Sequence, residues 1–135
     1  DTPQDITVAT KTSVLFSPDV KESKKKYTYI IKNWLPLNQK NYKEFRENDT
    51  LEEKLRILNR ILTHNILSIY KGFKYWTSEE ITGEICDIIR TRPIRYKGIS
   101  LISFDIRITT NALLPQFCGI GKGSSKGYGT IFGKN

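Results

Sequence analysis

The C-terminal part of the sequence holds a stretch in which glycines are interspersed with lysine, serine and tyrosine, GIGKGSSKGYGTIFG, at residues 119–133. Glycines let backbone N–H groups approach an anion unhindered by side chains, and successive N–H groups can form a concave anion-binding nest. The lysines add positive charge, the serines add hydrogen-bond donors and the tyrosine offers a ring for base stacking. This combination favours contact with RNA. The predicted contact residues are Gly119, Gly121, Lys122, Gly123, Ser124, Ser125, Lys126, Gly127, Tyr128 and Gly129.

Three other interpretations of this stretch fit the residues less well. A flexible, solvated tail would not be expected to contain the aromatic and aliphatic residues of YGTIFG (128–133). These residues indicate a strand that returns to the core. A P-loop requires Ser or Thr directly after its Gly-Lys pair, but Gly123 follows Lys122. The dinucleotide pattern G-x-G-x-x-G fails as well, because Ser124 stands where its third glycine belongs.

A second basic segment, RTRPIRYK, covers residues 90–97. The whole chain has 22 Lys and Arg against 14 Asp and Glu, and its formal net charge of +8 favours an anionic partner such as nucleic acid or an acidic membrane surface. In this segment arginines would grip phosphates while Tyr96 stacks on a base, but a solvated hairpin has the same composition. A basic interaction domain without a nucleic-acid role is therefore one alternative. The candidate contacts are Arg90, Arg92, Arg95 and Lys97.

Cysteine and histidine are too few for a metal site. Cys86 and Cys118 fit no CxxC spacing and His64 is the single histidine, so we expect no metal and no other cofactor. Cys86 lies in an apolar run, which predicts a packed, reduced thiol in a cytoplasmic protein. No apolar run approaches the roughly 18 residues of a spanning helix, so we expect no membrane partner. The chain starts at Asp1 and has no methionine, which indicates processing or truncation of a longer protein.

The elements that would position these residues begin after a polar N-terminus. Residues 1–12 indicate a linker or a frayed terminus, and SVLFS (13–17) favours a short strand. YTYIIKNW (27–34) alternates well enough to predict a second strand. LPLNQKN (35–41) indicates a loop, because proline removes a ladder donor and Asn and Gln favour turns.

The strongest predicted element is a helix over residues 50–70. Thr50 and Glu53 have the spacing of a capping box, and Lys71 with Gly72 suits the C-terminal end of the helix. One face of this helix is apolar, so it must lie on another element. The residues of that face are Leu51, Leu55, Leu58, Ile61, Leu62, Ile66 and Ile69.

The rest of the chain is rich in β-branched and aromatic residues and predicts a sheet. The predicted strands are 73–76, 81–90, 92–96, 99–110 and 129–133. Lys97-Gly98 suits a turn between the strands at 92–96 and 99–110. NALLPQF (111–117) predicts one short helical turn before Pro115. Along 99–110 the residues that face one side are Ile102, Phe104, Ile106 and Ile108. The pattern predicts an α+β sandwich with the long helix on one face of an antiparallel sheet.

LPQFCGIGKGSSKGYGTI (114–131) resembles the signature glycine-rich loop of the CRISPR-associated repeat-associated mysterious proteins. It is particularly similar to the C-terminal part of the endoribonucleases that process CRISPR precursor RNA. The shared pattern is Leu-Pro, a short apolar step, Gly-x-Gly-Lys-Gly, a Ser, then Gly-aromatic-Gly and a strand. Every part is present, from Leu114-Pro115 to Gly127-Tyr128-Gly129, and a looser likeness extends upstream to Trp34.

The resemblance implies a single ferredoxin-like (RNA-recognition-motif-like) βαββαβ domain over residues 13–135, with its C-terminal glycine-rich loop facing RNA. The second long helix of that fold is not evident in the sequence. Family members usually carry two such domains, so we expect this chain to be the C-terminal domain of a longer protein. The partners implied are CRISPR repeat RNA, an N-terminal domain of the same protein, and a second copy of the chain or other CRISPR-associated proteins.

The activity that the resemblance implies is metal-independent endoribonucleolytic cleavage in CRISPR antiviral defence, in which the RNA's own 2′-hydroxyl attacks the adjacent phosphate. A histidine often acts as the general base in that family, typically from the N-terminal domain. His64 is the histidine available here, on a helix where a packing or surface role is commoner than catalysis. A lysine could act as the general base instead, but nothing in the sequence indicates which one. The alternative function is a non-catalytic RNA-binding subunit of a CRISPR effector complex, which has the same loop.

Overall fold

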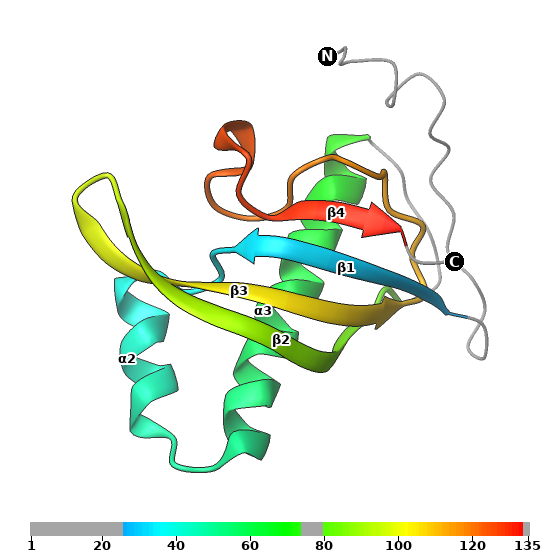
Figure 1. Cartoon of the computed structure of the whole chain (residues 1–135). Helices are drawn as coiled ribbons and strands as arrows, with labels where there is room; N and C mark the ends of the chain where they lie inside the picture. The colour runs from blue at the N-terminus through cyan, green and yellow to red at the C-terminus, as the bar shows by residue number, and fades with distance from the viewer. Residues whose placement is uncertain (1–25, 74–79, 134–135) are drawn as a thin grey trace.

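A computed structural model describes residues 26–73 and 80–133 as a four-stranded antiparallel sheet with two α-helices on one face (Figure 1). The predicted α+β class is therefore confirmed. The elements are β1 (Tyr27–Trp34), α2 (Gln39–Glu47), α3 (Leu51–Gly72), β2 (Gly83–Tyr96), β3 (Ile99–Thr110), the 3₁₀ turn η1 (Ser124–Lys126) and β4 (Thr130–Gly133). The predicted linker at 1–12 and strand at 13–17 lie outside the described residues, as does most of the strand predicted at 73–76.

The strand order across the sheet is β2-β3-β1-β4, so the predicted strands at 27–34 and 99–110 form its centre. Between β3 and β4 the chain, which is described throughout, forms no helix except η1. The helical turn predicted before Pro115 is wrong, because this segment hydrogen-bonds to side chains of other elements. The Leu114 N–H donates to Tyr29 Oη (2.8 Å), and Tyr70 Oη donates to the carbonyl of Leu113 (2.9 Å).

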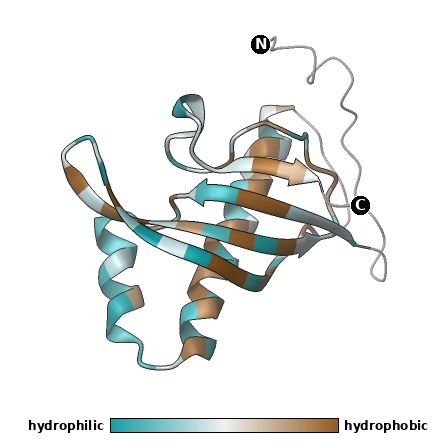
Figure 2. Ribbon diagram, viewed as in Figure 1, coloured by the Kyte–Doolittle hydropathy of each residue, from teal (hydrophilic) through white to brown (hydrophobic). Residues whose placement is uncertain are grey.

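Helix α3 confirms the predicted helix, with Thr50 as its N-cap accepting a hydrogen bond from the Glu53 N–H (3.2 Å). The prediction was wrong about Leu51, which was assigned to the apolar face, and about the C-terminal end of the helix. Leu51 is 67% exposed, and Gly72 is the last helical residue while Phe73 occupies the cap. The buried residues of α3 are Ile57, Leu58, Leu62, Ile66 and Tyr70. Figure 2 shows this apolar stripe of α3 beside the sheet.

Helix α2 begins inside the segment 35–41 that was predicted to be a loop, so that prediction is wrong for residues 39–41. Asn38 and Asn41 form a reciprocal capping box at its start, in which each side chain accepts from the other residue's N–H. Tyr42 and Phe45 are the residues of α2 that pack against the core. The rings of Phe45 and of Phe104 in β3 lie edge to face, with their centroids 6.3 Å apart. α2 therefore adds to the layer that α3 forms on the same face of the sheet.

Strands β2 and β3 form a long hairpin. The two strands predicted at 81–90 and 92–96 are one strand, because Pro93 lies on an outer strand where its missing N–H costs no ladder bond. Lys97 and Gly98 form the turn as predicted, with φ of 52° and 79°, the left-handed values of a two-residue hairpin turn.

Both outer strands of the sheet have polar backbone groups that other parts of the chain satisfy. On β2, Thr63 of α3 hydrogen-bonds with both the N–H and the carbonyl of Gly83, and Asn59 Oδ1 accepts from the Ile85 N–H (2.8 Å). On β4, Ile131 accepts from the Phe117 N–H and donates to the carbonyl of Cys118. The start of β2 and the middle of β4 are thus covered by the chain itself.

The packed thiol predicted at Cys86 is wrong. The register of β2 shifts between Ile85 and Asp87, and this bulge leaves Cys86 exposed. Cys118 is half-buried, and burial raises the pKa of its thiol above the usual value. The part of the chain that the structure describes contains no cluster of His, Cys, Asp and Glu that could hold a metal, and no helix there is long and apolar enough to cross a membrane.

We expect Cys86 to react several-fold faster than Cys118 with iodoacetamide at pH 8, because the thiolate is the nucleophile and Cys118 is both shielded and less ionised. Peptide mapping by mass spectrometry over a time course would give both rates in the folded protein. Equal rates in the folded state would contradict the burial difference, and equal rates in urea are the control.

Candidate nucleic-acid interface

The tip of the β2–β3 hairpin and the glycine segment (residues 119–129) meet at Tyr96. The Tyr96 ring lies 5.6 Å from the Tyr128 ring in an edge-to-face arrangement, and the Lys126 ammonium lies 5.7 Å from its centroid. A Cβ added at Gly123 would lie 3.1 Å from the Tyr96 ring, so the backbone of the segment comes close to it as well. Two basic segments that are separate in sequence therefore form one surface.

The middle of the glycine segment combines left-handed glycines with unpaired backbone N–H groups, two features of backbone anion nests. Gly121 and Gly123 are left-handed, with φ of 81° and 73°, and η1 follows them. Within the described part of the chain, no hydrogen bond engages the backbone N–H groups of Gly121, Lys122 or Gly123. Consecutive unpaired N–H groups in alternating left- and right-handed backbone can converge on an anion.

The close approaches that the glycines permit are largely to the protein's own atoms. A Cβ at Gly129 would overlap the carbonyl oxygen of Ile120, and one at Gly119 would overlap Ser124. At Gly121 it would meet Asn65 Oδ1 at 2.9 Å. At Gly127 a Cβ meets nothing within 4 Å. Internal packing thus explains why most of these positions need glycine. The sequence had suggested instead that the close approach of a ligand requires it.

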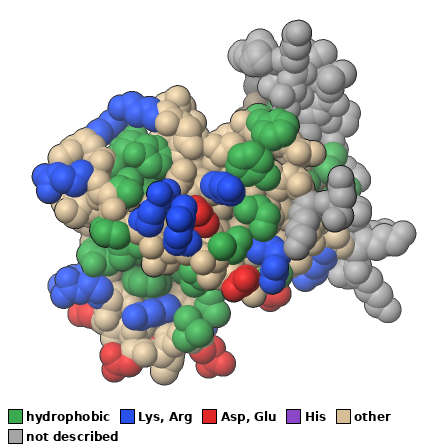
Figure 3. All heavy atoms as spheres, in the orientation of Figure 1, with side chains coloured by type: hydrophobic (Ala, Val, Ile, Leu, Met, Phe, Trp, Pro, Cys, Tyr) green, Lys and Arg blue, Asp and Glu red, His purple; other side chains and the backbone are tan. Residues whose placement is uncertain are grey.

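The open face of the sheet, opposite the helices, carries several cations. Figure 3 shows Lys and Arg side chains gathered over the middle of this face. They come from three strands and comprise Lys32 (β1), Arg90 and Arg92 (β2) and Arg107 (β3). The two arginines of β2 were predicted contacts, but Lys32 and Arg107 were not. Each is an isolated cation in an alternating strand, and its neighbours depend on the strand register.

A polar network, the Asn33–Asp105 node, holds the two arginines of β2. Asp105 is 8% exposed, accepts a hydrogen bond from the Asn33 N–H (2.9 Å) and pairs with Arg90 (3.6 Å). Asn33 has a left-handed φ of 56°, and its side-chain oxygen accepts from Arg92. Its carbonyl accepts from the Gly129 N–H (2.9 Å). The node therefore links the arginines of the hairpin to the end of the glycine segment.

The remaining predicted residues of the hairpin lie at its tip. Arg95 and Lys97 are both exposed; Arg95 donates to the carbonyl of Gly98 (3.0 Å), and the Lys97 ammonium lies 5.5 Å from the Tyr96 ring. Ser124, Ser125 and Lys126 form η1 and are exposed. At the tip, Tyr96 therefore lies close to Gly123, Lys126 and Tyr128, whereas Arg90 and Arg92 lie further along β2 at the Asn33–Asp105 node.

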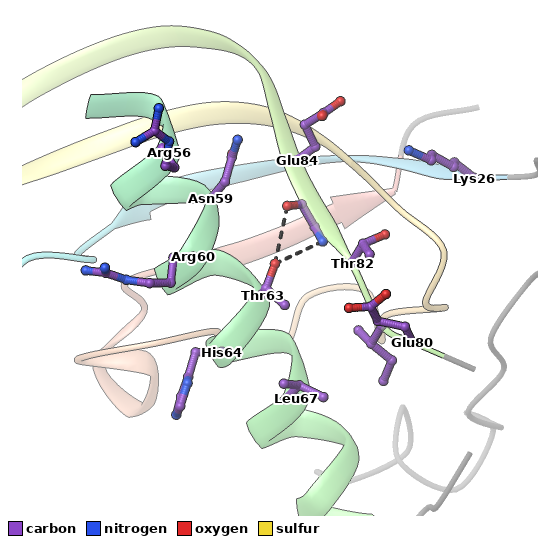
Figure 4. A pocket seen from close by; sticks show the side chains of 12 residues that line it. Lys26, Arg56, Asn59, Arg60, Thr63, His64, Leu67, Glu80, Thr82 and Glu84 are labelled. Atoms are coloured by element: carbon purple, nitrogen blue, oxygen red, sulfur yellow. Dashed lines mark hydrogen bonds between the residues drawn. The ribbon is translucent and has the colours of Figure 1, made fainter. Parts of the chain in front are cut away.

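His64 lies elsewhere on α3. It is exposed and lines a hollow of about 660 Å³ between α3 and the start of β2, together with Arg56, Arg60 and Glu80 (Figure 4). No residue of the glycine segment lines this hollow. The structure therefore gives His64 no contact with the two basic segments.

Comparisons with known proteins agree on one family. A family model described as "Cas6b C-terminal domain" matches residues 20–133. A relative from Methanocaldococcus jannaschii, the uncharacterized protein MJ0978, is 35% identical over 112 residues, which is 83% of this chain and 74% of that protein.

Solved structures show the same likeness. One titled "Crystal structure of Cas6b" and one titled "Crystal structure of CRISPR RNA processing endoribonuclease Cas6b" each match with a TM-score of 0.78 and 27% identity over 88% of this chain. The chain spans 53% and 59% of the length of those two chains. A type IV Cas6 crRNA endonuclease, Csf5, matches with a TM-score of 0.59 at 15% identity, which shows a shared fold alone.

Proposed function

The chain belongs to the Cas6b C-terminal domain family, and from this membership we propose that it binds CRISPR precursor RNA during its endoribonucleolytic processing. The observation that carries the proposal is the meeting of the basic hairpin and the glycine segment at Tyr96. Cations for phosphates, unpaired backbone N–H groups and a half-buried aromatic pair are groups that can bind single-stranded RNA.

The ferredoxin-like assignment is part of this proposal. The strand order β2-β3-β1-β4, with α2 and α3 between β1 and β2, supports it. An extended segment replaces the helix expected between β3 and β4. We further propose that the chain is the C-terminal domain of a two-domain protein, because it spans little more than half of the solved relatives.

The role proposed for this chain is to hold RNA rather than to supply the general base. The hairpin and glycine segment offer positive charge and hydrogen-bond donors, which could stabilise the charge that develops on a phosphate during attack by the 2′-hydroxyl. Neither segment contains a histidine, and His64 lies against a different hollow. A histidine that serves as general base in metal-independent cleavage would then come from outside this surface.

We expect Lys122→Ala to weaken binding of labelled CRISPR-repeat RNA about fivefold at low salt, because one phosphate contact is lost. The slope of log K against log salt should become shallower by about 0.7 to 1. Fluorescence titrations at several salt concentrations would measure both quantities. Lys43→Ala, the same change on the exposed surface of α2, is the matched control and should leave the slope unchanged.

Two results would overturn the proposal. If the parent chain does not bind repeat RNA, the domain has no RNA role of its own. If Lys122→Ala and Lys43→Ala behave alike at every salt concentration, the RNA site lies away from the glycine segment.

A further inference from the structure

A polar groove separates the C-terminal half of α3 from the glycine segment. It has a volume of about 420 Å³, and α3 contributes Asn65, Ser68 and Ile69 to its wall. The opposite wall is formed by residues 119–122 and Ser124. The groove is distinct from the hollow that His64 lines on the same helix. The residues of the glycine wall were predicted to contact RNA, whereas no role was predicted for those that α3 contributes.

Asn65 is held in one orientation by Trp34. The indole N–H of Trp34 donates to Asn65 Oδ1 (3.0 Å), and Trp34 is fully buried. An indole N–H can only donate, so it must meet the amide oxygen, which fixes the amide nitrogen as the free end of the side chain. Among the described residues, none accepts a hydrogen bond from Asn65 Nδ2. The structure therefore presents a pre-oriented donor beside the groove.

The wall opposite Asn65 offers donors too. Gly121 comes so close to Asn65 that a Cβ there would lie 2.9 Å from Oδ1, and Gly121 and Lys122, whose N–H groups are unpaired among the described residues, both line that opposite wall. Lys122 adds an ammonium group. The side chains that line the groove include Asn, Ser and Lys, and none of its lining residues is Asp or Glu. A groove that offers donors and a positive charge without a carboxylate suits an anion.

We propose that this groove binds a phosphodiester of the RNA backbone, with Asn65 Nδ2 as a donor from α3 that acts opposite the glycine segment. The inference rests on the proposed function, because it takes RNA as the ligand. It adds a binding residue that carries no charge and lies outside both basic segments. An RNA strand that reaches this groove from Tyr96 follows the glycine segment past Gly123, which contacts Tyr96, to Gly121.

The test is Asn65→Asp, with Asn59→Asp as the matched control. Each change adds one negative charge to α3, and each keeps the oxygen that accepts the existing bond, from Trp34 Nε1 or from the Ile85 N–H. Only Asn65→Asp replaces a donor of the groove; Asn59 faces β2 and lines the other hollow (Figure 4). We expect Asn65→Asp to weaken repeat-RNA binding at least tenfold and Asn59→Asp less than twofold, at equal melting temperatures.

Asn65→Ala removes the donor without adding charge and should weaken binding about threefold, which tests the proposal even if the aspartate variant folds poorly. If Asn65→Asp and Asn59→Asp weaken binding equally, or if Asn65→Ala binds like the parent, the groove is not a phosphate site. Measuring Lys122→Ala in the same experiment separates the proposed function from this further inference. If Lys122→Ala weakens binding as expected and the Asn65 variants do not, only the further inference is overturned. Failure of the parent chain to bind RNA overturns both.

Discussion

Replacing Gly129 by Ala should lower the free energy of unfolding by about 3 kcal/mol. Gly129 is buried with a φ of 71°, and this left-handed conformation costs a non-glycine residue about 1–2 kcal/mol. The new Cβ would also overlap the carbonyl oxygen of Ile120, which is backbone and has little room to move. Moving it strains two hydrogen bonds: Gly129 donates to Asn33 (2.9 Å) and accepts from the Ile120 N–H (2.9 Å).

The matched control is Gly127→Ala, two residues earlier. Gly127 has a φ of 91°, so the conformational cost is similar, but a Cβ there meets nothing within 4 Å. We expect this variant to lose only about 1–2 kcal/mol. Urea unfolding followed by far-ultraviolet circular dichroism would measure both losses. Equal losses in the two variants would show that Gly129 is required for its backbone angle alone.

Asp105→Asn should weaken repeat-RNA binding about tenfold, although it removes a negative charge from a surface proposed to bind RNA. Simple charge counting predicts the opposite sign, because deleting an anion raises the attraction for a polyanion. The expected loss arises because Asn keeps the oxygen that accepts from the Asn33 N–H but places an amide NH2 where the carboxylate oxygen Oδ2 pairs with Arg90. Release of Arg90 costs binding free energy when its side chain must be ordered again.

Asp87→Asn provides the control for this comparison. Asp87 is exposed and pairs with Arg107 on the neighbouring strand at 3.8 Å, so it carries the same charge without belonging to the Asn33–Asp105 node. We expect that variant to bind RNA as well as the parent or slightly more tightly. Titrations of labelled repeat RNA at one salt concentration, below the melting temperature of both variants, would compare their affinities. Tighter binding by Asp105→Asn would mean that the node does not position the arginines.

The sequence predicts the parts of this fold whose periodicity is strong. The alternation of 27–34 and 99–110 and the apolar stripe of 50–70 predict β1, β3 and α3, since each buries one face against the others. Helix α2 escaped prediction because only Tyr42 and Phe45 pack against the core, and its start looks like a turn. Its capping box uses two asparagines, residue types that equally favour loops.

The sequence predicts which segments form the candidate site, but it does not predict how these segments come together. Glycines with lysines at 119–129, and arginines at 90–95, identify the two basic segments without any structure. Their contact at Tyr96 depends on the register of the hairpin and on the path of the chain after β3. The hydrogen bond between Asn33 and Asp105 joins residues 72 positions apart, and nothing local in the sequence marks either as a partner of the other.

The covered outer strands decide how this domain can meet other proteins. An outer strand with free N–H and carbonyl groups is a template for pairing with a strand from another chain, and so for aggregation. Here Thr63 and Asn59 occupy those groups at the start of β2, and two bulges and Pro93 interrupt the remainder of that strand. Residues 117–119 occupy the corresponding groups of β4. Within the described residues, β4 and the start of β2 are therefore closed to extension of the sheet, and a partner that meets the domain there must bind through side chains rather than by adding a strand.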